Sequence, residues 1–282
     1  MPDIPGVDVA SWQGEPGQWV NHPAARGIQW AAVKFTEVST QYGTYENPQA
    51  KADWDWLWEN KKGRIAYLFA HPAASVSDTV AAFRSMTEKL GLLPEDGIAV
   101  DLETTDGMSP AEVSSWAREL LAELAALYGR RPILYTYLNF ALSGNCEGLE
   151  NYLLWIASIT TAGMPQVPAP WRDWFAQQYV LAQPNSVDQD VAHFSSLAAM
   201  QAAMGQAQFK TVEAVHVTTG EDTMVSLSHL LQCEISEMLG LTLNAQADRM
   251  FSGNLKDYLD YGNLQAFIPK GVAIRYMETV RA

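Results

Sequence analysis

The feature that most constrains this chain is an apolar run that ends in two carboxylates, Gly97-Ile-Ala-Val-Asp-Leu-Glu103. If the run forms a strand, Asp101 and Glu103 project from one face, because strand side chains alternate with period 2, and their Cα atoms lie roughly 6.6–7 Å apart. Like charges at that spacing favour a pair in which one group holds a proton and the other stays ionised, as glycoside hydrolysis requires. Two solvated acids at a strand end are the alternative, and the motif alone does not decide between them.

Two further acids stand at the ends of predicted strands. The segment Pro5–Gly14 carries Asp8, and Ser186–Asp190 carries Asp188, near the end of the alternating β and α signals. Acids at the ends of the first, a middle and the last strand converge only if the sheet closes into a barrel, where catalytic groups come from the C-terminal ends of several strands. The pattern therefore predicts an α/β fold, a TIM-like (β/α) barrel.

Helical patterns separate these strands. Residues 78–90 are periodic and end before Gly91. Ser109-Pro-Ala-Glu112 is a capping box with proline at the first helical position, and it begins a helix that we expect to end near Tyr128. Residues 97–137 are therefore predicted to form a strand–helix–strand unit.

The first two hundred residues resemble glycoside hydrolase family 25, the lysozyme-type muramidases of bacteria and of phage endolysins. Short matching segments follow one another in the order of the family's eight strands, and eight of them in register make the resemblance specific. They are Asp8–Gly14, Val33–Glu37, Ala66–Ala70, Val100–Glu103, Ile133–Tyr137, Leu154–Ala157, Trp174–Tyr179 and Val187–Asp188.

Four positions depart from the usual pattern of that family. Ala10 stands where the family commonly has serine, Val38 replaces a usual glycine, and Leu68 stands where histidine is frequent. Asp190 lies where asparagine is common after the final acid. None of these changes removes a carboxylate, so they bear on subsite details and pH optimum rather than on the reaction.

The resemblance implies cleavage of the β-1,4 bond from N-acetylmuramic acid to N-acetylglucosamine. Glu103 would be the general acid, with its pKa raised by Asp101. Asp101 would stay ionised and either stabilise the oxocarbenium-like state or orient the N-acetyl group of the substrate. Asp8 and Asp188 would complete the acidic rim and position substrate and water.

Residues beside these acids are candidates for sugar contacts. Aromatic faces hold sugar rings, although most Trp and Tyr side chains in a barrel fill its core, and that alternative stays open for each of them. The predicted substrate-binding residues are Trp12, Glu37, Tyr67, Phe69, Tyr135, Trp155, Gln177 and Tyr179.

The formal net charge of −14 excludes some classes of partner. Binding to a polyanion needs a basic stripe, so nucleic acid is not expected. Capture by an anionic cell wall must rest on stacking and hydrogen bonds rather than on charge. No Gly-rich phosphate loop follows a strand, and no Cys/His cluster has metal-ligand spacing, so we expect no cofactor and no metal. Cys146 and Cys233 are expected to be free, semi-buried thiols.

The location of the protein is predicted from targeting signals. No apolar stretch reaches the length of a transmembrane helix, and no secretory signal pattern is visible, so we expect no membrane insertion. With the resemblance, this predicts a monomeric phage endolysin that stays in the host cytoplasm until a holin-type pore releases it to the wall. A virion-associated lysin is the alternative.

A second domain is expected beyond the barrel. Residues 198–208 are rich in Ala, Gln, Met and Gly, which predicts a short helix or linker. We therefore expect a catalytic domain over residues 1–205 and a cell-wall-binding module over residues 209–282.

The second domain resembles a LysM module, which binds N-acetylglucosamine-containing glycans. A predicted strand at 212–217 is followed by a helix–turn–helix pattern at 221–239, and a Pro-Lys-Gly turn leads into a closing strand within 267–276. This is the β-α-α-β order of LysM, although 242–265 is longer than the usual second loop. A small helical appendage that serves dimerisation or stability is the alternative.

These patterns together predict a two-domain enzyme whose partner is bacterial peptidoglycan. Two other functions stay open. A non-catalytic protein on the same barrel would bind cell walls without releasing reducing ends, and a chitinase-like hydrolase would cleave polymeric N-acetylglucosamine.

Overall fold

The computed structural model describes residues 3–14, 16–182 and 186–205, together with the backbone of four strands beyond them. The chain divides into two compact units, Met1–Gln208 and Phe209–Ala282.

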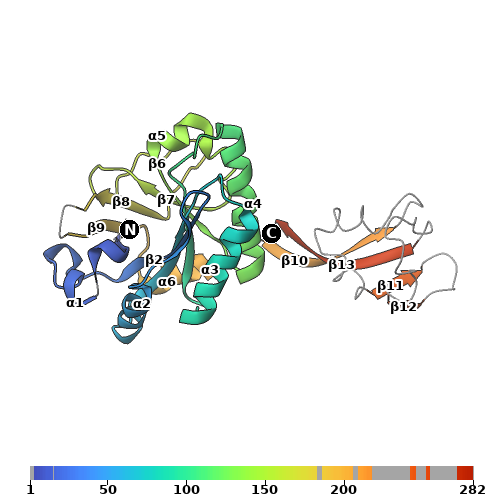
Figure 1. The fold of residues 1–282 in the computed structure, drawn as a ribbon, viewed down its shortest axis with the longest axis horizontal. Coiled ribbons are helices and arrows are strands. Elements are labelled where there is room, and N and C mark those ends of the chain that lie inside the picture. Colours follow the sequence, from blue (N-terminus) through green and yellow to red (C-terminus); the bar gives the residue numbers. More distant parts are fainter. Residues whose placement is uncertain are drawn as a thin grey trace. The chain divides into compact units, whose positions relative to one another are not determined.

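The first unit is a closed eight-stranded barrel with a hairpin strand on its edge, which confirms the predicted (β/α) barrel (Figure 1). The strand order is β1-β9-β8-β7-β6-β5-β4-β2, and a further pairing of β1 with β2 closes the ring. The short strand β3 pairs with β2 alone. The strands are β1 Ile4–Val9, β2 Trp30–Ser39, β3 Gly43–Glu46, β4 Gly63–Phe69, β5 Gly97–Asp101, β6 Ile133–Tyr137, β7 Leu153–Ala157, β8 Ala176–Val180 and β9 Asp188–Ala192.

The last barrel strand runs against its neighbours. β9 is antiparallel to both β1 and β8, whereas the other neighbouring pairs in the ring are parallel. Asp188 is the first residue of β9, so it lies at the rim where the parallel strands end, directly across from Asp8 at the end of β1. A strand read as parallel would have placed Asp188 at the opposite rim.

Helices cover the outside of the barrel (Figure 1). The capping box at Ser109 is present, with Glu112 N donating to Ser109 Oγ and the Glu112 carboxylate accepting from Ser109 N, and the helix ends before Gly129 in the left-handed conformation. Ser75 caps the preceding helix, which begins two residues earlier than the sequence pattern predicts. The helices are α1 Pro16–Trp19, α2 Ala50–Glu59, α3 Val76–Leu90, α4 Pro110–Tyr128, α5 Leu138–Phe140 and α6 Leu197–Gly205.

The segment predicted as a short helix or linker at 198–208 contains α6, a helix that packs into the barrel core. Met200 and Met204 on α6 are fully buried in the core cluster. A Cβ atom on Gly97, the first residue of β5, would lie 2.5 Å from Met204 Sδ, so glycine is required for this close approach. The helix therefore covers the end of the barrel where the parallel strands begin.

The barrel interior is filled by large side chains opposite small ones. Trp30 is fully buried, and its Nε1 donates to Ile4 O at 3.1 Å. A Cβ atom on Gly6, which faces Trp30 on the neighbouring strand, would lie 2.1 Å from Trp30 Cε2. The core below the rim is therefore filled by side chains among the described residues, and the cleft that they leave opens at the rim.

The second unit has a four-stranded antiparallel sheet in the order β10-β13-β11-β12, of which Figure 1 shows the long β10–β13 pair. Its strands are β10 Phe209–Val217, β11 Thr242–Ala245, β12 Ser252–Asn254 and β13 Val272–Arg281. The expected opening and closing strands fall within β10 and β13, whereas β11 and β12 were not expected. The predicted helices at 221–239 and the Pro-Lys-Gly turn lie outside the described residues, so the LysM-like module stays a prediction.

Two smaller expectations concern membranes and thiols. No helix in the described part of the chain is long and apolar enough to cross a membrane. Cys146 is a free, buried cysteine, and burial raises the pKa of its thiol to about 12. Cys233 lies outside the described residues.

Candidate active site

A cleft of about 580 Å³ opens at the rim where the parallel barrel strands end. The four predicted acids Asp8, Asp101, Glu103 and Asp188 line it. So do six of the predicted sugar contacts, which are Trp12, Glu37, Tyr67, Phe69, Tyr135 and Trp155. The structure therefore brings together residues from the first, second, fourth, fifth, sixth, seventh and ninth strands and from the turn after the first.

Asp101 and Glu103 form the centre of the cleft. Asp101 is the last residue of β5, and its Oδ1 is buried without a hydrogen-bond partner among the described residues. Burial, followed by the charges of Glu103 and Asp8, raises the pKa of Asp101 well above its usual value. Burial also raises the pKa of Glu103, an effect that Lys34 partly offsets and Asp188 reinforces.

The division of labour within the pair stays a prediction. Asp101 was expected to stay ionised and to raise the pKa of Glu103. Burial raises the pKa of both groups, and the charge of Glu103 adds to the shift of Asp101. Because the two groups interact, ionisation of one disfavours ionisation of the other, and they titrate as a pair.

Asp8 and Asp188 face each other across the β1–β9 pair. Burial, with a contribution from the charge of Asp188, raises the pKa of Asp8 to about 7. Gln178 Nε2 donates to Asp8 Oδ2 at 2.8 Å, and Ala182 N donates to Asp188 Oδ1 at 2.8 Å. Burial raises the pKa of Asp188 as well, and the backbone hydrogen bond from Ala182 acts against this shift.

A β-bulge in β2 brings a lysine into the cleft. The register shifts between Lys34 and Thr36, so that Lys34 pairs with Tyr67 whereas Glu37 pairs with Phe69. Residues three apart on a regular strand point to opposite faces, but the extra residue of the bulge places both Lys34 and Glu37 in the cleft. Lys34 Nζ lies 2.6 Å from Glu37 Oε2 and 4.7 Å from the centre of the Phe69 ring. A prediction that assumes strict alternation of side chains along β2 therefore places only one of these two residues in the cleft, and it misses Lys34.

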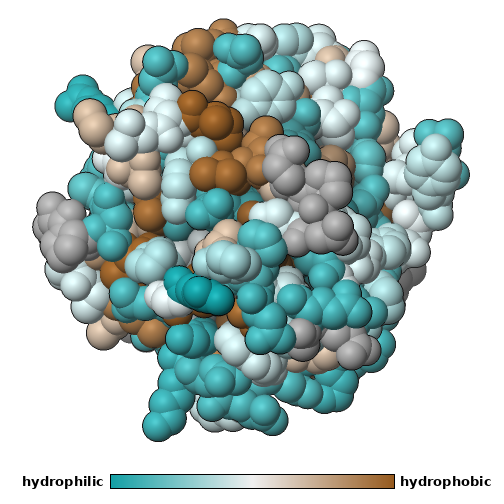
Figure 2. All heavy atoms as spheres, turned by 90° about the vertical axis from the view of Figure 1, so that its left-hand side faces the viewer, coloured by the Kyte–Doolittle hydropathy of each residue, from teal (hydrophilic) through white to brown (hydrophobic). Residues whose placement is uncertain are grey.

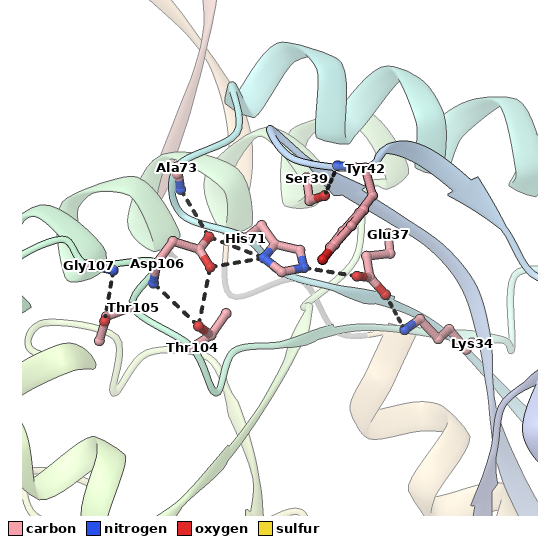
Figure 3. Close-up of polar contacts among 10 residues, drawn as sticks. All are labelled: Lys34, Glu37, Ser39, Tyr42, His71, Ala73, Thr104, Thr105, Asp106 and Gly107. Atoms are coloured by element: carbon pink, nitrogen blue, oxygen red, sulfur yellow. Dashed lines mark hydrogen bonds and ion pairs between the residues drawn. The ribbon is translucent and has the colours of Figure 1, made fainter.

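His71 connects the wall of the cleft to the loop after β5 (Figure 3). Its Nε2 lies 2.9 Å from Glu37 Oε1, and its Nδ1 lies 3.0 Å from Asp106 Oδ1. Burial acts to lower the pKa of His71, but the hydrogen bonds to Asp106 and Glu37 outweigh it and raise the pKa. A doubly protonated imidazole donates on both sides, which suits two carboxylate acceptors. His71 was not identified from the sequence as part of the site.

Aromatic side chains form the other walls. Tyr135 and Trp155 are buried with their rings in an edge-to-face contact, 4.8 Å between centroids. Trp12 and Tyr42 are 62% and 80% exposed, and Tyr45 Oη donates to Ser11 Oγ at 2.7 Å. The exposed rings are free to contact a sugar, whereas the buried ones also complete the core.

Two predicted sugar contacts do not line the cleft. Gln177 is fully buried, and its Nε2 donates to Ser158 O at 2.8 Å while its Oε1 accepts from Gly163 N at 2.8 Å, so it holds the loop between β7 and β8. Tyr179 Oη donates to Gln189 Oε1 at 3.2 Å. The inward residue of β8 is Gln178, because successive strand side chains point to opposite faces. The other lining residues that the sequence did not identify are Ala10, Ser11, Lys34, Tyr42, Tyr45 and Leu181.

Apolar side chains are exposed on the loops that follow β6, β7 and β8. Leu142, Ile159, Met164 and Leu181 are each more than half exposed. On the face drawn in Figure 2, hydrophobic residues gather in the upper half, whereas hydrophilic residues cover most of the lower half. Such surface offers contacts that do not depend on charge, which suits an acidic protein.

The chemistry available at this site is proton transfer between carboxyl groups and a bound ligand. Within the described residues, no group of three or more His, Cys, Asp or Glu side chains is arranged to hold a metal ion. Several buried carboxyl groups with raised pKa values, set beside one lysine, provide both a proton donor and anionic groups near neutral pH.

The chain is similar to a family of glycosyl hydrolases in sequence and to several solved structures in fold. The sequence profile described as "Glycosyl hydrolases family 25" matches residues 7–187. The fold is similar to a muramidase from Acremonium alcalophilum, with 24% identity, a TM-score of 0.59 and coverage of 72% of this chain and 100% of that chain. A bacterial lysozyme from Streptomyces coelicolor has 23% identity and a TM-score of 0.59, covering 73% of this chain and 98% of that chain.

A third similar structure extends beyond the barrel. The spore cortex lytic enzyme SleM from Clostridium perfringens matches with 14% identity and a TM-score of 0.56, covering 99% of this chain and 98% of that chain. No curated protein sequence matches the chain.

Proposed function

This chain belongs to glycosyl hydrolases family 25, and we propose that it hydrolyses bacterial peptidoglycan at the β-1,4 bond between N-acetylmuramic acid and N-acetylglucosamine. The observation that carries the proposal is the pair of Asp101 and Glu103, set in a cleft with two further buried acids. Glycosidic cleavage needs a protonated and an ionised carboxyl group, and a pair that shares a proton supplies both. The similar muramidase and lysozyme structures support the same substrate class.

In this proposal Glu103 is the general acid. Its proton passes to the glycosidic oxygen as the bond from that oxygen to the anomeric carbon breaks. Asp101 is ionised in that state and either stabilises the positive charge on the sugar ring or orients the N-acetyl group of the substrate. Asp8 and Asp188, on the opposite side of the barrel ring, position the substrate and the water that attacks the anomeric carbon.

The test is digestion of purified peptidoglycan followed by mass spectrometry of the products. We expect new reducing ends that carry N-acetylmuramic acid. Reducing ends that carry N-acetylglucosamine would contradict the proposed bond. Cleavage of polymeric N-acetylglucosamine without cleavage of peptidoglycan would favour a chitinase-like hydrolase, and wall binding without any release would favour a non-catalytic protein.

We further propose that the protein is a monomeric phage endolysin that acts from the host cytoplasm and that residues 209–282 bind wall glycans. The support is the resemblance of the sequence to endolysins and of its C-terminal part to LysM modules. Expression inside a susceptible bacterium should cause lysis only when a membrane pore is supplied. Lysis without a pore, at equal expression, would contradict release through a holin-type pore.

A further inference from the structure

Asp190, the third residue of β9, is a buried acid that the reaction outlined above does not use. It is 1% exposed and lies across from Gly6 on β1 and Gln178 on β8. Its Oδ1 accepts a hydrogen bond from Trp155 Nε1 at 2.8 Å. Its Oδ2 is buried, and no donor from the described residues reaches it. An ionised carboxylate would leave this oxygen without compensation for its lost hydration, which is costly.

The carboxyl of Asp8 is the neighbour of Asp190, because Asp8 projects from the same face of β1 as Gly6, which lies across from Asp190. Gln178 lies beside both acids. The two carboxyl groups influence each other as hydrogen-bond partners. Two ionised carboxylates have only acceptors, so this contact requires a proton on one of them. The neighbouring amide indicates which one. Tyr135 Oη donates to Gln178 Oε1 at 3.0 Å, and this bond directs Gln178 Nε2 toward Asp8 Oδ2 at 2.8 Å. Asp8 therefore acts as an acceptor, and the proton belongs on Asp190.

We propose that Asp190 is a positioning residue that keeps a proton on Oδ2 and donates it in a hydrogen bond to Asp8. Asp8 is then the acceptor between two donors, Asp190 and Gln178, which favours its ionised form against the effect of burial, and it faces the cleft. The part of this inference that concerns catalysis rests on the proposed function, in which Asp8 positions substrate and water. The part that concerns the proton on Asp190 does not.

The charges around Asp190 agree with a protonated acid. Burial is the main cause that raises its pKa well above the usual value, and the charge of Asp8 adds to it. Asp188 on the same strand acts in the same direction, and the Trp155 hydrogen bond acts against it. Ionisation of Asp190 would also raise the pKa of two nearby tyrosines, Tyr135 on β6 and Tyr179 on β8. The largest influences on the pKa of Asp190 include no cation.

Two substitutions separate a protonated from an ionised Asp190. Asp190→Asn replaces a neutral donor by a neutral donor and still accepts from Trp155, whereas Asp190→Leu has a similar size and no donor. We expect the Asn variant to keep the KM, kcat and acid limb of the wild-type pH profile for peptidoglycan hydrolysis. We expect the Leu variant to lose about tenfold or more in kcat, as for one hydrogen bond to a charged group, and to shift the acid limb to higher pH.

An ionised Asp190 predicts the opposite for the Asn variant. Removing a negative charge beside Asp8 would lower the pKa of Asp8 and move the acid limb to lower pH. That result would overturn the proposal. Asp53→Asn is the matched control, because Asp53 is a fully buried aspartate that accepts from Trp19 Nε1 at 2.8 Å on α2, outside the cleft. This variant should leave the pH profile unchanged.

A measurement that does not depend on enzymatic activity distinguishes a failure of the proposal on Asp190 from a failure of the proposed function. Carbon-13 NMR of protein labelled at the aspartate carboxyl carbons gives such a readout, and the resonance that is missing in Asp190→Asn is assigned to Asp190. In the wild-type protein this resonance should have the chemical shift of a protonated acid at neutral pH. A carboxylate shift at that pH would overturn the proposal, even if the Leu variant does not fold. If neither wild type nor Asn variant hydrolyses peptidoglycan, the proposed function fails, and the NMR titration still decides whether Asp190 holds the proton.

Discussion

At the scale of single residues, the site is a set of carboxyl groups whose burial sets their protonation. Asp8, Asp101 and Glu103 all have raised pKa values, and burial is the first cause for each of them. Lys34 is the cation that lowers the pKa values of Asp101 and Glu103. Burial and this charge act in opposite directions on the two groups, so their balance sets the protonation of the pair.

Glu103→Gln tests the proton donor. The amide keeps the size and hydrogen bonding of the side chain but cannot donate an acidic proton, so kcat should fall by roughly 10²–10⁴-fold while the melting temperature changes little. The rate of release of reducing ends from peptidoglycan measures this. Glu119→Gln on the exposed face of α4 is the matched control and should retain activity. Near-normal activity of Glu103→Gln would contradict the assignment.

Asp101→Asn tests the coupling within the pair. Turnover should fall strongly, and the alkaline limb of the pH profile should move to lower pH, because Glu103 loses the neighbour whose negative charge opposes its ionisation. The pH dependence of kcat on soluble glycan fragments measures the shift. An alkaline limb that stays in place in the residual activity would show that the two acids are not coupled.

At the scale of secondary-structure elements, the walls of the cleft are joined by one histidine. His71 in the loop after β4 bridges Glu37 on β2 and Asp106 in the loop after β5. Asp106 adopts a left-handed conformation with φ of 49°, and its carboxylate also accepts from Ala73 N at 3.3 Å. The loop that carries Glu103 is therefore attached to β2 and β4 through polar contacts (Figure 3).

His71→Gln should destabilise the protein in a pH-dependent way. The folded-state pKa of His71 is raised, so its stabilising contribution is fully present below the unfolded value of about 6.5 and is lost as pH rises through the folded-state pKa. The pKa of Glu37 is lowered, so its contribution is lost as pH falls through its own folded-state value. The loss in melting temperature should therefore be largest near pH 6 and smaller at pH 9.

Thermal melting at several pH values measures this dependence. His22→Gln is the control, because His22 Nδ1 accepts a hydrogen bond from Ala24 N at 3.1 Å and gains no carboxylate partner from protonation there. A loss in melting temperature that is equal at pH 6 and pH 9 for His71→Gln would show that the charged imidazole does not stabilise the contact.

At the scale of the whole molecule, the barrel unit includes α6, and the catalytic domain extends to the end of that helix. Fragment 1–208 should fold cooperatively, whereas fragment 1–196, which lacks α6, should be less stable by several kcal/mol, since loss of one buried Met side chain costs about 2–5 kcal/mol. Urea unfolding of both fragments measures the difference. Equal midpoints would contradict a structural role for α6.

Removal of residues 209–282 should affect intact cells more than soluble substrate. A wall-binding module raises the local concentration of the enzyme at the wall, so fragment 1–208 should lyse cells more slowly but hydrolyse soluble fragments at a similar rate. The isolated segment 209–282 should sediment with peptidoglycan at low and high salt alike, since its six Lys and Arg against nine Asp and Glu give a formal net charge of −3, which gains little from attraction to an anionic wall. A segment that stays in the supernatant at both salt concentrations would favour a structural appendage.

The sequence by itself determined the class of the fold and the identity of its acids. Apolar runs of strand length, the capping box at Ser109 and the paired acids Asp101 and Glu103 are local features, and local sterics and alternation are enough to interpret them. Eight short segments in register added the family, although each segment alone is weak.

Only the tertiary structure decided which further side chains reach the cleft and how far burial shifts the pKa values of its acids. A bulge in β2 turned Lys34 inward, alternation on β8 selected Gln178 instead of Gln177, and the antiparallel direction of β9 brought Asp188 to the rim. These outcomes depend on pairing with strands distant in sequence and on the water excluded by them. Register and burial are properties of the closed barrel, so no local pattern along the chain contains them.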